Sequence, residues 1–226
     1  MKAIIFDSGT LISFSMSGLI GELKKLKKIF DGKFLITKEV KKEVIDKPLT
    51  IKRFELDALK IKQLLDEKIL EMPSSLKIND GFVENKTKEI LDIANNTFIS
   101  EGKPIHLIDF GEASCLVLSK ILTEKKIENI IAIDERTTRM LGEKPENLMK
   151  LMESKLHTHL NSRKENYKHF NGFNFIRSTE LVYVAYKKDL IDLKDGNIIL
   201  DALLYSLKLK GAAISDDEIR EIKGMK

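Results

Sequence analysis

The chain has 226 residues, 42% of them hydrophobic, which is enough for one large domain or two small ones around a packed core. This composition excludes disorder throughout the chain. The 39 lysine and arginine residues nearly balance the 35 aspartate and glutamate residues. Because the resulting net charge is only +4, any surface for nucleic acid must be local.

The single cysteine and the lengths of the apolar runs indicate in which cellular compartment the protein is expected. Cys115 cannot form an internal disulfide and lies in an apolar run, so we interpret it as a small buried hydrophobic residue in a reducing cytoplasm. No stretch approaches the roughly 20 apolar residues that a membrane helix needs. The first apolar run is too short for a signal peptide and ends at Asp7. We therefore expect a cytoplasmic protein without a membrane partner.

Four short apolar runs are typical of strands that are buried on both faces of a parallel sheet. In chain order they cover residues 3–6, 34–36, 130–133 and 173–176. Helical patterns lie between them. Strands that alternate with helices predict an α/β fold with a central, mainly parallel sheet and helices on both faces.

The helical patterns have recognisable starts and stops. Residues 111–125 give the clearest pattern, with apolar side chains on one face, and Thr37 can cap an earlier helix that carries Glu43. Near the end, Gly211 can stop a helix over residues 200–207, and Ser215 begins a capping box for the last helix.

Two segments interrupt the alternation of strands and helices. Residues 48–104 predict helices around a loop, and residues 142–171 form a polar, helix-prone insert with local positive charge. This basic insert could contact RNA phosphates, with Tyr167 and Phe170 for base stacking. A solvated amphipathic helix is the alternative that we favour. The candidate phosphate contacts are Lys155, Arg163, Lys164 and Lys168.

Two acidic residues directly follow apolar strands. Asp7 comes after residues 3–6, and Asp134 comes after residues 130–133. The carboxyl ends of parallel strands meet at one edge of the sheet, where ligands collect, so these two carboxylates can face each other. Each also has an ordinary explanation, because an aspartate after a strand often caps the next helix or turn.

Two further acids lie on the predicted helices. Glu112 stands in a first turn, where the helix dipole stabilises a carboxylate by about 0.3–1 kcal/mol. Asp109, three residues earlier, can cap the same helix, so this pair has a purely structural explanation. Glu43 flanks the buried face of its helix, although a solvated surface position explains it more simply.

The four acids together are more specific than any one of them. The predicted fold brings Asp7, Glu43, Glu112 and Asp134 toward one edge of the sheet. Closely packed carboxylates repel one another and need protonation or a counter-ion. Oxygen ligands of this kind suit hard divalent cations, so the cluster predicts a site for Mg²⁺ or Mn²⁺.

Four segments also carry a resemblance to a known family, in the order residues 4–8, 37–43, 109–114 and 133–136. Residues 111–113 read Gly-Glu-Ala. Together these segments resemble the PIN-domain proteins, specifically archaeal-type members with that signature. Residues 176–191 and 200–219 look like the closing strand and helices of the group, so the resemblance spans most of the chain.

The resemblance implies a three-layer α/β/α PIN-like domain over residues 1–226, with helical inserts at about 48–104 and 142–171. It also implies a ribonuclease that depends on Mg²⁺ or Mn²⁺ and uses acids to hold metal and activate water. Its metal-binding and catalytic residues correspond here to Asp7, Glu43, Glu112 and Asp134, with Ser8, Asp109 and Glu135 as possible secondary residues.

On this prediction Asp7 and Glu112 share a divalent ion, Asp134 or Glu135 completes its shell, and Glu43 orients or deprotonates water. RNA is the expected substrate. Small PIN nucleases are often toxins that dimerise and are held by an antitoxin, so a homodimer and an antitoxin-like partner are also expected possibilities. A role in RNA processing or degradation competes with the toxin role, because the inserts make this chain larger than the usual toxin.

Other functions fit the residues less well. The start Asp7-Ser8-Gly9-Thr10 is also similar to haloacid-dehalogenase-like phosphatases, but Gly9 replaces the general acid that they need. Sugar kinases and actin-like ATPases need a longer chain and a second glycine-rich loop. The pair His157 and His159 lacks further ligands for zinc. The main alternative is a PIN-like module that binds RNA or a partner without cleaving.

Overall fold

Four parallel strands form the central sheet in the order β2-β1-β5-β7. The computed structural model describes residues 1–193 and 198–225. All four predicted strands are confirmed, although β7 is shorter than its apolar run. Their bounds are β1 Lys2–Phe6, β2 Gly32–Leu35, β5 Glu128–Ala132 and β7 Phe175–Ile176.

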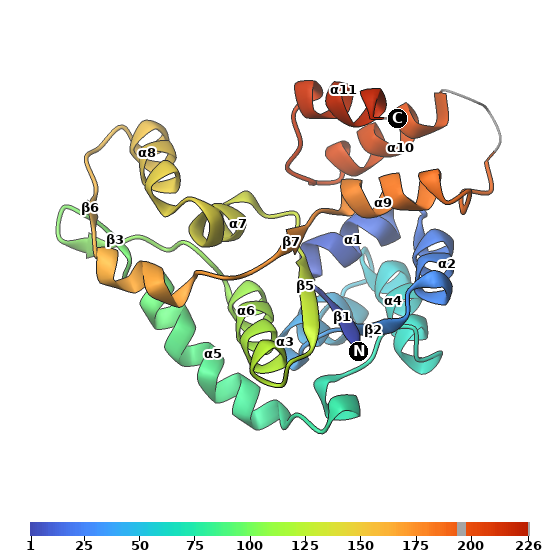
Figure 1. Cartoon of the computed structure of the whole chain (residues 1–226), viewed down its shortest axis with the longest axis horizontal. Coiled ribbons are helices and arrows are strands. Elements are labelled where there is room, and N and C mark those ends of the chain that lie inside the picture. The colour runs from blue at the N-terminus through green and yellow to red at the C-terminus, as the bar shows by residue number, and fades with distance from the viewer. Residues whose placement is uncertain (194–197, 226) are drawn as a thin grey trace.

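Helices cover both faces of this sheet, which confirms the three-layer α/β/α prediction (Figure 1). Helix α6 (Phe110–Glu124) packs on β1 and β5. On the other face, α2 (Ile20–Ile29) packs on β2 and is joined by α9 (Ser178–Lys187). Helix α1 (Ser8–Met16) begins directly after β1 and contacts both α2 and α9.

The predicted helix after Thr37 forms in two parts. The Thr37 hydroxyl accepts a hydrogen bond from the Val40 N–H at 3.2 Å and starts α3 (Lys38–Lys41). The chain then widens into a π-helical segment, η1 (Lys42–Asp46), which carries Glu43. Short π-helical segments occur often at functional sites, because the extra residue in the turn re-aims the side chains.

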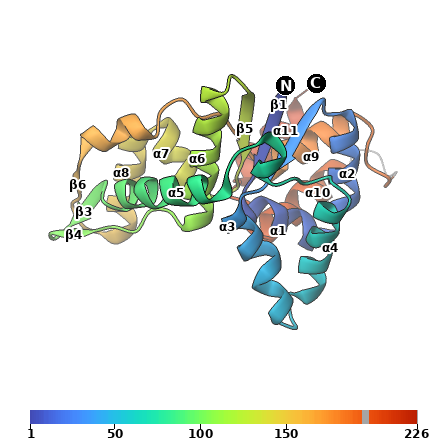
Figure 2. The ribbon, with the colours of Figure 1, turned by 90° about the horizontal axis from the view of Figure 1, so that it is seen from below.

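The segment over residues 48–104 is helical as predicted, but it also contains two short strands. Its helices are η2 (Pro48–Thr50), α4 (Glu55–Asp66), η3 (Pro73–Leu76) and α5 (Asp80–Asn95). Seen from below in Figure 2, η1, η2 and α4 form a hairpin that projects from the body. The strands β3 (Phe98–Ser100) and β4 (Lys103–Pro104) belong to a second, antiparallel sheet.

That second sheet links the two inserts, because β6 (Asn161–Ser162) pairs with β3. Helix α7 (Arg136–Glu143) leads into the basic insert, which contains α8 (Pro145–Leu156) and, after β6, the 3-10 helix η4 (Lys164–His169). The favoured alternative, a solvated amphipathic helix around residues 155–169, is therefore wrong, because this stretch contains the end of α8, strand β6 and the separate 3-10 helix η4.

The proposed base-stacking residues of the insert lie inside the protein. Phe170 is fully buried, and the half-buried Tyr167 packs edge-on against Phe98 with ring centroids 6.4 Å apart. The expectation that Tyr167 and Phe170 are available for stacking on RNA is therefore wrong. Their apolar area stabilises the second sheet instead, because burying an aromatic side chain contributes about 1.5–3 kcal/mol.

The C-terminal helices form a small pair above α9 and α1 (Figure 1). Helix α10 (Ile198–Leu209) ends before Gly211, whose φ of +111° favours glycine, and the predicted Ser215 capping box starts α11 (Asp216–Gly224). The pair has a separate apolar cluster, formed by Leu200, Leu204, Ile214, Ile219 and Ile222. Arg177 joins it to α9 through an ion pair to Glu218.

One main core holds the rest of the chain together. It contains strand residues such as Ile5 and Ile131 together with Phe98 and Leu148 from the two inserts. Cys115 is buried within it, as predicted, and its thiol lies 3.8 Å from the Phe6 carbonyl oxygen. No helix in the described ranges is long and apolar enough to cross a membrane.

Candidate functional site

A pocket of about 270 Å³ lies beyond the carboxyl ends of β1 and β5. The backbone of Asp7 continues the sheet, because its N–H donates to the Ala132 carbonyl at 2.9 Å. Three of the four predicted acids line this pocket. Its residues are Asp7, Ser8, Gly9, Ile12, Ser13, Glu112, Asp134, Glu135, Lys210 and Gly211.

Asp7 is the most buried acid in the pocket, with 2% of the residue exposed. Its Oδ2 accepts a hydrogen bond from the Gly9 N–H at 3.1 Å, so the structural role as cap of α1 is real. Its Oδ1 is buried without a hydrogen-bond partner. Burial and then the nearby Glu112 carboxylate raise the pKa of Asp7 to about 8. A neutralising partner for this carboxylate would therefore be strongly favoured.

Asp134 occupies the equivalent place after β5 and is 3% exposed. Its Oδ1 accepts from the Ser178 N–H at 2.8 Å, at the start of α9, and its Oδ2 is buried without a partner. The neighbouring Glu135 is different, because its Oε2 caps α7 by accepting from the Thr138 N–H at 2.6 Å. Of the two candidates for the fourth acid, Asp134 has the buried free oxygen.

Glu112 lies at the start of α6, as predicted. Its Oε2 accepts from the Asp109 N–H at 2.8 Å, which completes the capping box that explains this pair structurally. Burial raises the pKa of Glu112, and the Asp109 and Glu43 charges add to this rise. Asp109 itself is exposed and contacts His106, with Oδ1 and Nε2 2.8 Å apart. The structure thus places Glu112 in the pocket and leaves Asp109 outside it.

Glu43 does not line the pocket, but its carboxylate lies close behind it. A Cβ atom at Gly111 would meet Glu43 Oε2 at 2.6 Å and Oε1 at 3.0 Å, so this contact requires the glycine of the Gly-Glu-Ala segment. Burial raises the pKa of Glu43, and the Ser8 hydroxyl and the Gly111 amide oppose that rise. Glu43 is therefore half-buried and turned toward the other acids. The simpler explanation, a solvated surface position, is wrong.

Three of the four acids share one electrostatic environment, since the Glu112 and Glu43 carboxylates both raise the pKa of Asp7. Within residues 1–193 and 198–225, however, no three Asp, Glu, His or Cys side chains converge closely enough to form a ready-made metal-binding group. The two free buried oxygens on Asp7 and Asp134 still suit a hard divalent cation, which prefers carboxylate ligands. The residues present therefore fit Mg²⁺ or Mn²⁺ in donor chemistry.

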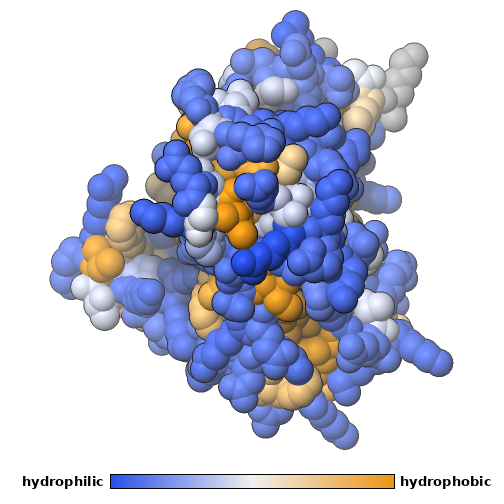
Figure 3. All heavy atoms as spheres, turned by 90° about the vertical axis from the view of Figure 1, so that its left-hand side faces the viewer, coloured by the Kyte–Doolittle hydropathy of each residue, from blue (hydrophilic) through white to orange (hydrophobic). Residues whose placement is uncertain are grey.

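The basic insert lies apart from this pocket. Lys155 ends α8, and Arg163, Lys164 and Lys168 lie in or next to η4; all four are exposed, and none lines the acid pocket. Figure 3 views this end of the molecule and shows a mainly hydrophilic face with a strip of hydrophobic side chains. The insert and the acids therefore do not form one site.

Sequence reasoning missed two groups that complete the pocket. Lys210 and Gly211 enter it from the loop after α10, which is remote in sequence. The backbone N–H of Ser178 orients Asp134, and a backbone donor cannot be predicted from a pattern of side chains. The only signal for the first group was Gly211 itself, which indicates a sharp turn after a helix.

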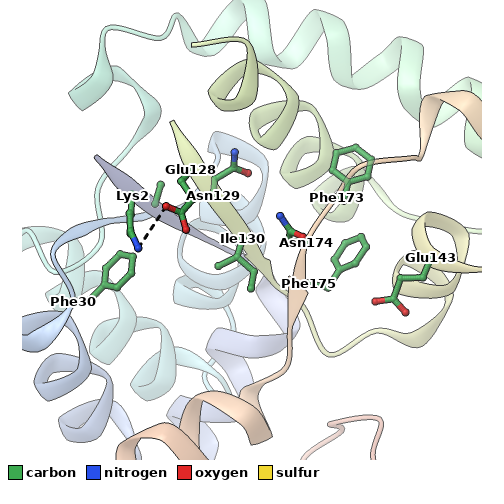
Figure 4. A pocket seen from close by; sticks show the side chains of 10 residues that line it. Lys2, Phe30, Glu128, Asn129, Ile130, Glu143, Phe173, Asn174 and Phe175 are labelled. Carbon is green, nitrogen blue, oxygen red and sulfur yellow. Dashed lines mark ion pairs between the residues drawn. The ribbon is translucent and has the colours of Figure 1, made fainter. Parts of the chain in front are cut away.

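A wider hollow of about 470 Å³ lies at the opposite end of the strands, near the starts of β1 and β5 (Figure 4). Phe30, Phe173 and Phe175 line it together with an ion pair between Lys2 and Glu128, whose Nζ and Oε2 are 3.5 Å apart. Its lining has two acids, Glu128 and Glu143, and Glu128 is the partner of Lys2 in that ion pair. Comparison of the chain with models of protein families, with curated proteins and with solved structures finds no match.

Proposed function

We propose that the protein is a PIN-like ribonuclease that hydrolyses phosphodiester bonds of RNA with the help of Mg²⁺ or Mn²⁺. The observation that carries the proposal is the pair of buried carboxylates, Asp7 and Asp134, each with one oxygen that lacks a protein partner. They follow neighbouring parallel strands and line one pocket with Glu112. Such oxygens cost free energy unless a cation or proton satisfies them.

Each acid has a separate role in this proposal. Asp7, Glu112 and Asp134 would hold the ion, which supplies charge stabilisation and an activated water when bound. Glu43 would orient or deprotonate a water beside the acids, and the rise that burial causes in its pKa is in the direction that suits a general base. Ser8 steadies Glu43, and Glu135 holds α7 in place.

The test is cleavage of mixed single-stranded and structured RNA by the purified protein. We expect cutting with Mn²⁺ or Mg²⁺, none with chelator, and a loss of at least about 100-fold in the Asp7→Asn variant. The matched control is Asp31→Asn, which changes an exposed aspartate before β2. Cutting by Asp7→Asn at the wild-type rate would contradict the site assignment.

The alternative is a PIN-like module that binds RNA or a partner and cleaves nothing. On either proposal the partners are RNA and, by resemblance to the family, a second copy or an antitoxin-like protein. The same experiment separates the two, because the alternative predicts tight RNA or metal binding without any cleavage.

A further inference from the structure

A groove of about 820 Å³ continues the wall of the acid pocket, between α7 and the loop that joins α10 to α11. The acid pocket and the groove are lined by neighbouring residues of the same two segments, the start of α7 and the loop after α10. Glu135 and Gly211 line the acid pocket, whereas Arg136 and Ala213 line the groove. The groove residues are Arg136, Arg139, Met140, Glu143, Lys144, Asn147, Ala213, Ile214, Ser215 and Glu218.

The charges in this groove are unbalanced. Within residues 1–193 and 198–225, none of Arg136, Arg139 and Lys144 has an ion-pair partner. Two carboxylates line the groove with them, and one of these, Glu218, accepts a hydrogen bond from the Arg177 guanidinium at 2.6 Å. The carboxylates of Glu143, Glu180 and Asp134 all act on Arg139, whereas Arg136 and Lys144 are the exposed cations of the lining. The groove is therefore positive, directly beside an acidic pocket.

Arg139 is the group that most needs an anion. It is half-buried, and its Nε is buried without a hydrogen-bond partner. Burial and then the Arg177 guanidinium lower the pKa of Arg139, and the carboxylates of Glu143, Glu180 and Asp134 oppose this lowering. A desolvated guanidinium with an unsatisfied N–H costs free energy, and a phosphate oxygen is its best-matched partner.

The spread of the cations favours a chain of phosphates over a single anion. A helix rises 1.5 Å per residue, so Arg136 and Lys144 lie roughly 12 Å apart along α7. The half-buried Met140 lines the groove beside the cations and adds some apolar surface to it. A polyanion that approaches the acid pocket also needs such cations to offset its repulsion by the carboxylates.

We propose that this groove binds the phosphodiester backbone of the RNA strand on which the acid pocket acts, with Arg136, Arg139 and Lys144 contacting its phosphates. The inference rests on the proposed ribonuclease function, since RNA is its ligand. It assigns strand binding to the groove beside the acids, which includes Lys144 at the start of the basic insert, and not to the remote part of the insert over residues 155–168.

The test is binding of a short fluorescein-labelled single-stranded RNA of mixed sequence to the full chain, measured by fluorescence anisotropy in chelator so that no cleavage occurs. The variant Arg136→Gln/Lys144→Gln removes two exposed cations that have no ion pair. The matched control, Lys125→Gln/Lys126→Gln, removes two exposed cations at the far end of α6. Circular dichroism melts check that both variants fold.

We expect the groove variant to bind about tenfold more weakly at 0.1 M salt and the control to bind within about twofold of the wild type. The slope of log K against log salt should fall by about 1.4 in the groove variant, at 0.7 for each lost phosphate contact. Equal effects in the two variants, no effect in the groove variant, or no RNA binding by the wild type would each overturn the inference.

A second variant tests whether the guanidinium of Arg139 matters beyond its positive charge. Arg139→Lys retains the charge but loses the bidentate guanidinium, and we expect about tenfold weaker binding. Failure of the groove proposal can be distinguished from failure of the ribonuclease proposal, because RNA binding is measured without metal. If the groove variants bind RNA more weakly but the wild type shows no metal-dependent cleavage, only the ribonuclease proposal is overturned. Cleavage with wild-type binding in the groove variants would overturn only this inference.

Discussion

Asp7 combines a structural role with an energetic cost. One of its oxygens caps α1, and the other is buried without a partner beside Glu112. Its pKa lies near 3.8 in the unfolded chain and about 8 in the folded protein. The stability linked to the protonated form is fully present below 3.8 and is lost as the pH rises through 8. A free carboxylate at this place therefore destabilises the metal-free protein at alkaline pH.

Replacing Asp7 by Asn should therefore stabilise the metal-free protein at pH 8.5 while abolishing cleavage. We expect the free energy of unfolding to rise on the order of a few kcal/mol at pH 8.5 and to change little near pH 4. Urea unfolding at both pH values, in chelator, measures this difference. Mg²⁺ should raise the stability of the wild type at pH 8.5 more than that of the variant.

Asp31→Asn serves as the control for this pH profile, because Asp31 is exposed before β2. Its stability should follow the wild type across the same range. If Asp7→Asn instead lost stability at pH 8.5, the ionised carboxylate would have to be compensated within the folded protein, and the cation site would lose its energetic argument.

At the scale of elements, the site depends on the contact between η1 and the start of α6. Gly111 has no side chain, and the Glu43 carboxylate occupies the space that a Cβ atom would fill. The π-helical form of η1 brings Glu43 to that place from a helix whose neighbours, Val44 and Ile45, are buried. The contact thus fixes where Glu43, the proposed general base, lies relative to the acid pocket.

Replacing Gly111 by Ala should displace Glu43 and lower the cleavage rate by about tenfold or more, because small misplacements of catalytic groups are costly. Stability should change by less than about 1 kcal/mol, since the gain in helix propensity offsets part of the clash. The control is Gly21→Ala in α2, where a Cβ atom meets nothing within 4 Å. It should keep the wild-type rate. Full activity in Gly111→Ala would remove Glu43 from the mechanism.

The sequence predicted those elements whose signals are local. Strands β1, β2, β5 and β7 follow from short apolar runs, and the Thr37 and Ser215 caps follow from side chains that bond within three residues. The second sheet was missed, because β3 and β6 have only three and two residues and pair across more than 60 positions of the chain, as in Phe98 with Ser162. Tyr167 and Phe170 were misplaced for the same reason, since the partner that buries them is distant in sequence.

The candidate site divides in the same way. The carboxylates after β1 and β5 could be expected at one edge, because strand direction alone brings them together. The choice of Asp134 over Glu135 needed the structure, since it depends on which carboxylate caps α7. Arg136 and Arg139 were not singled out, because the remote loop that faces them and the partial burial of Arg139 cannot be read from the sequence.

At the scale of the whole molecule, positive charge occupies two separate regions. The groove beside the acid pocket contains Arg136, Arg139 and Lys144, and the basic insert presents Lys155 and the residues near η4 at the other end of the molecule (Figure 1). The net charge of +4 is too small to attract RNA over the entire surface. Which region binds RNA is therefore decided by local contacts, and only the groove adjoins the acids.

Neutralising the basic insert should accordingly leave RNA binding almost unchanged. We expect Lys155→Gln/Arg163→Gln/Lys164→Gln to bind labelled single-stranded RNA within about twofold of the wild type at 0.1 M salt, with the same salt slope. The reason is that the aromatic residues of the insert are packed inside the protein, so its exposed lysines have no stacking surface beside them. A slope that fell by about 2 would mean that all three cations contact phosphates. The bound strand would then cross the face shown in Figure 3, and the path from the acid pocket would have to run over α7 to α8.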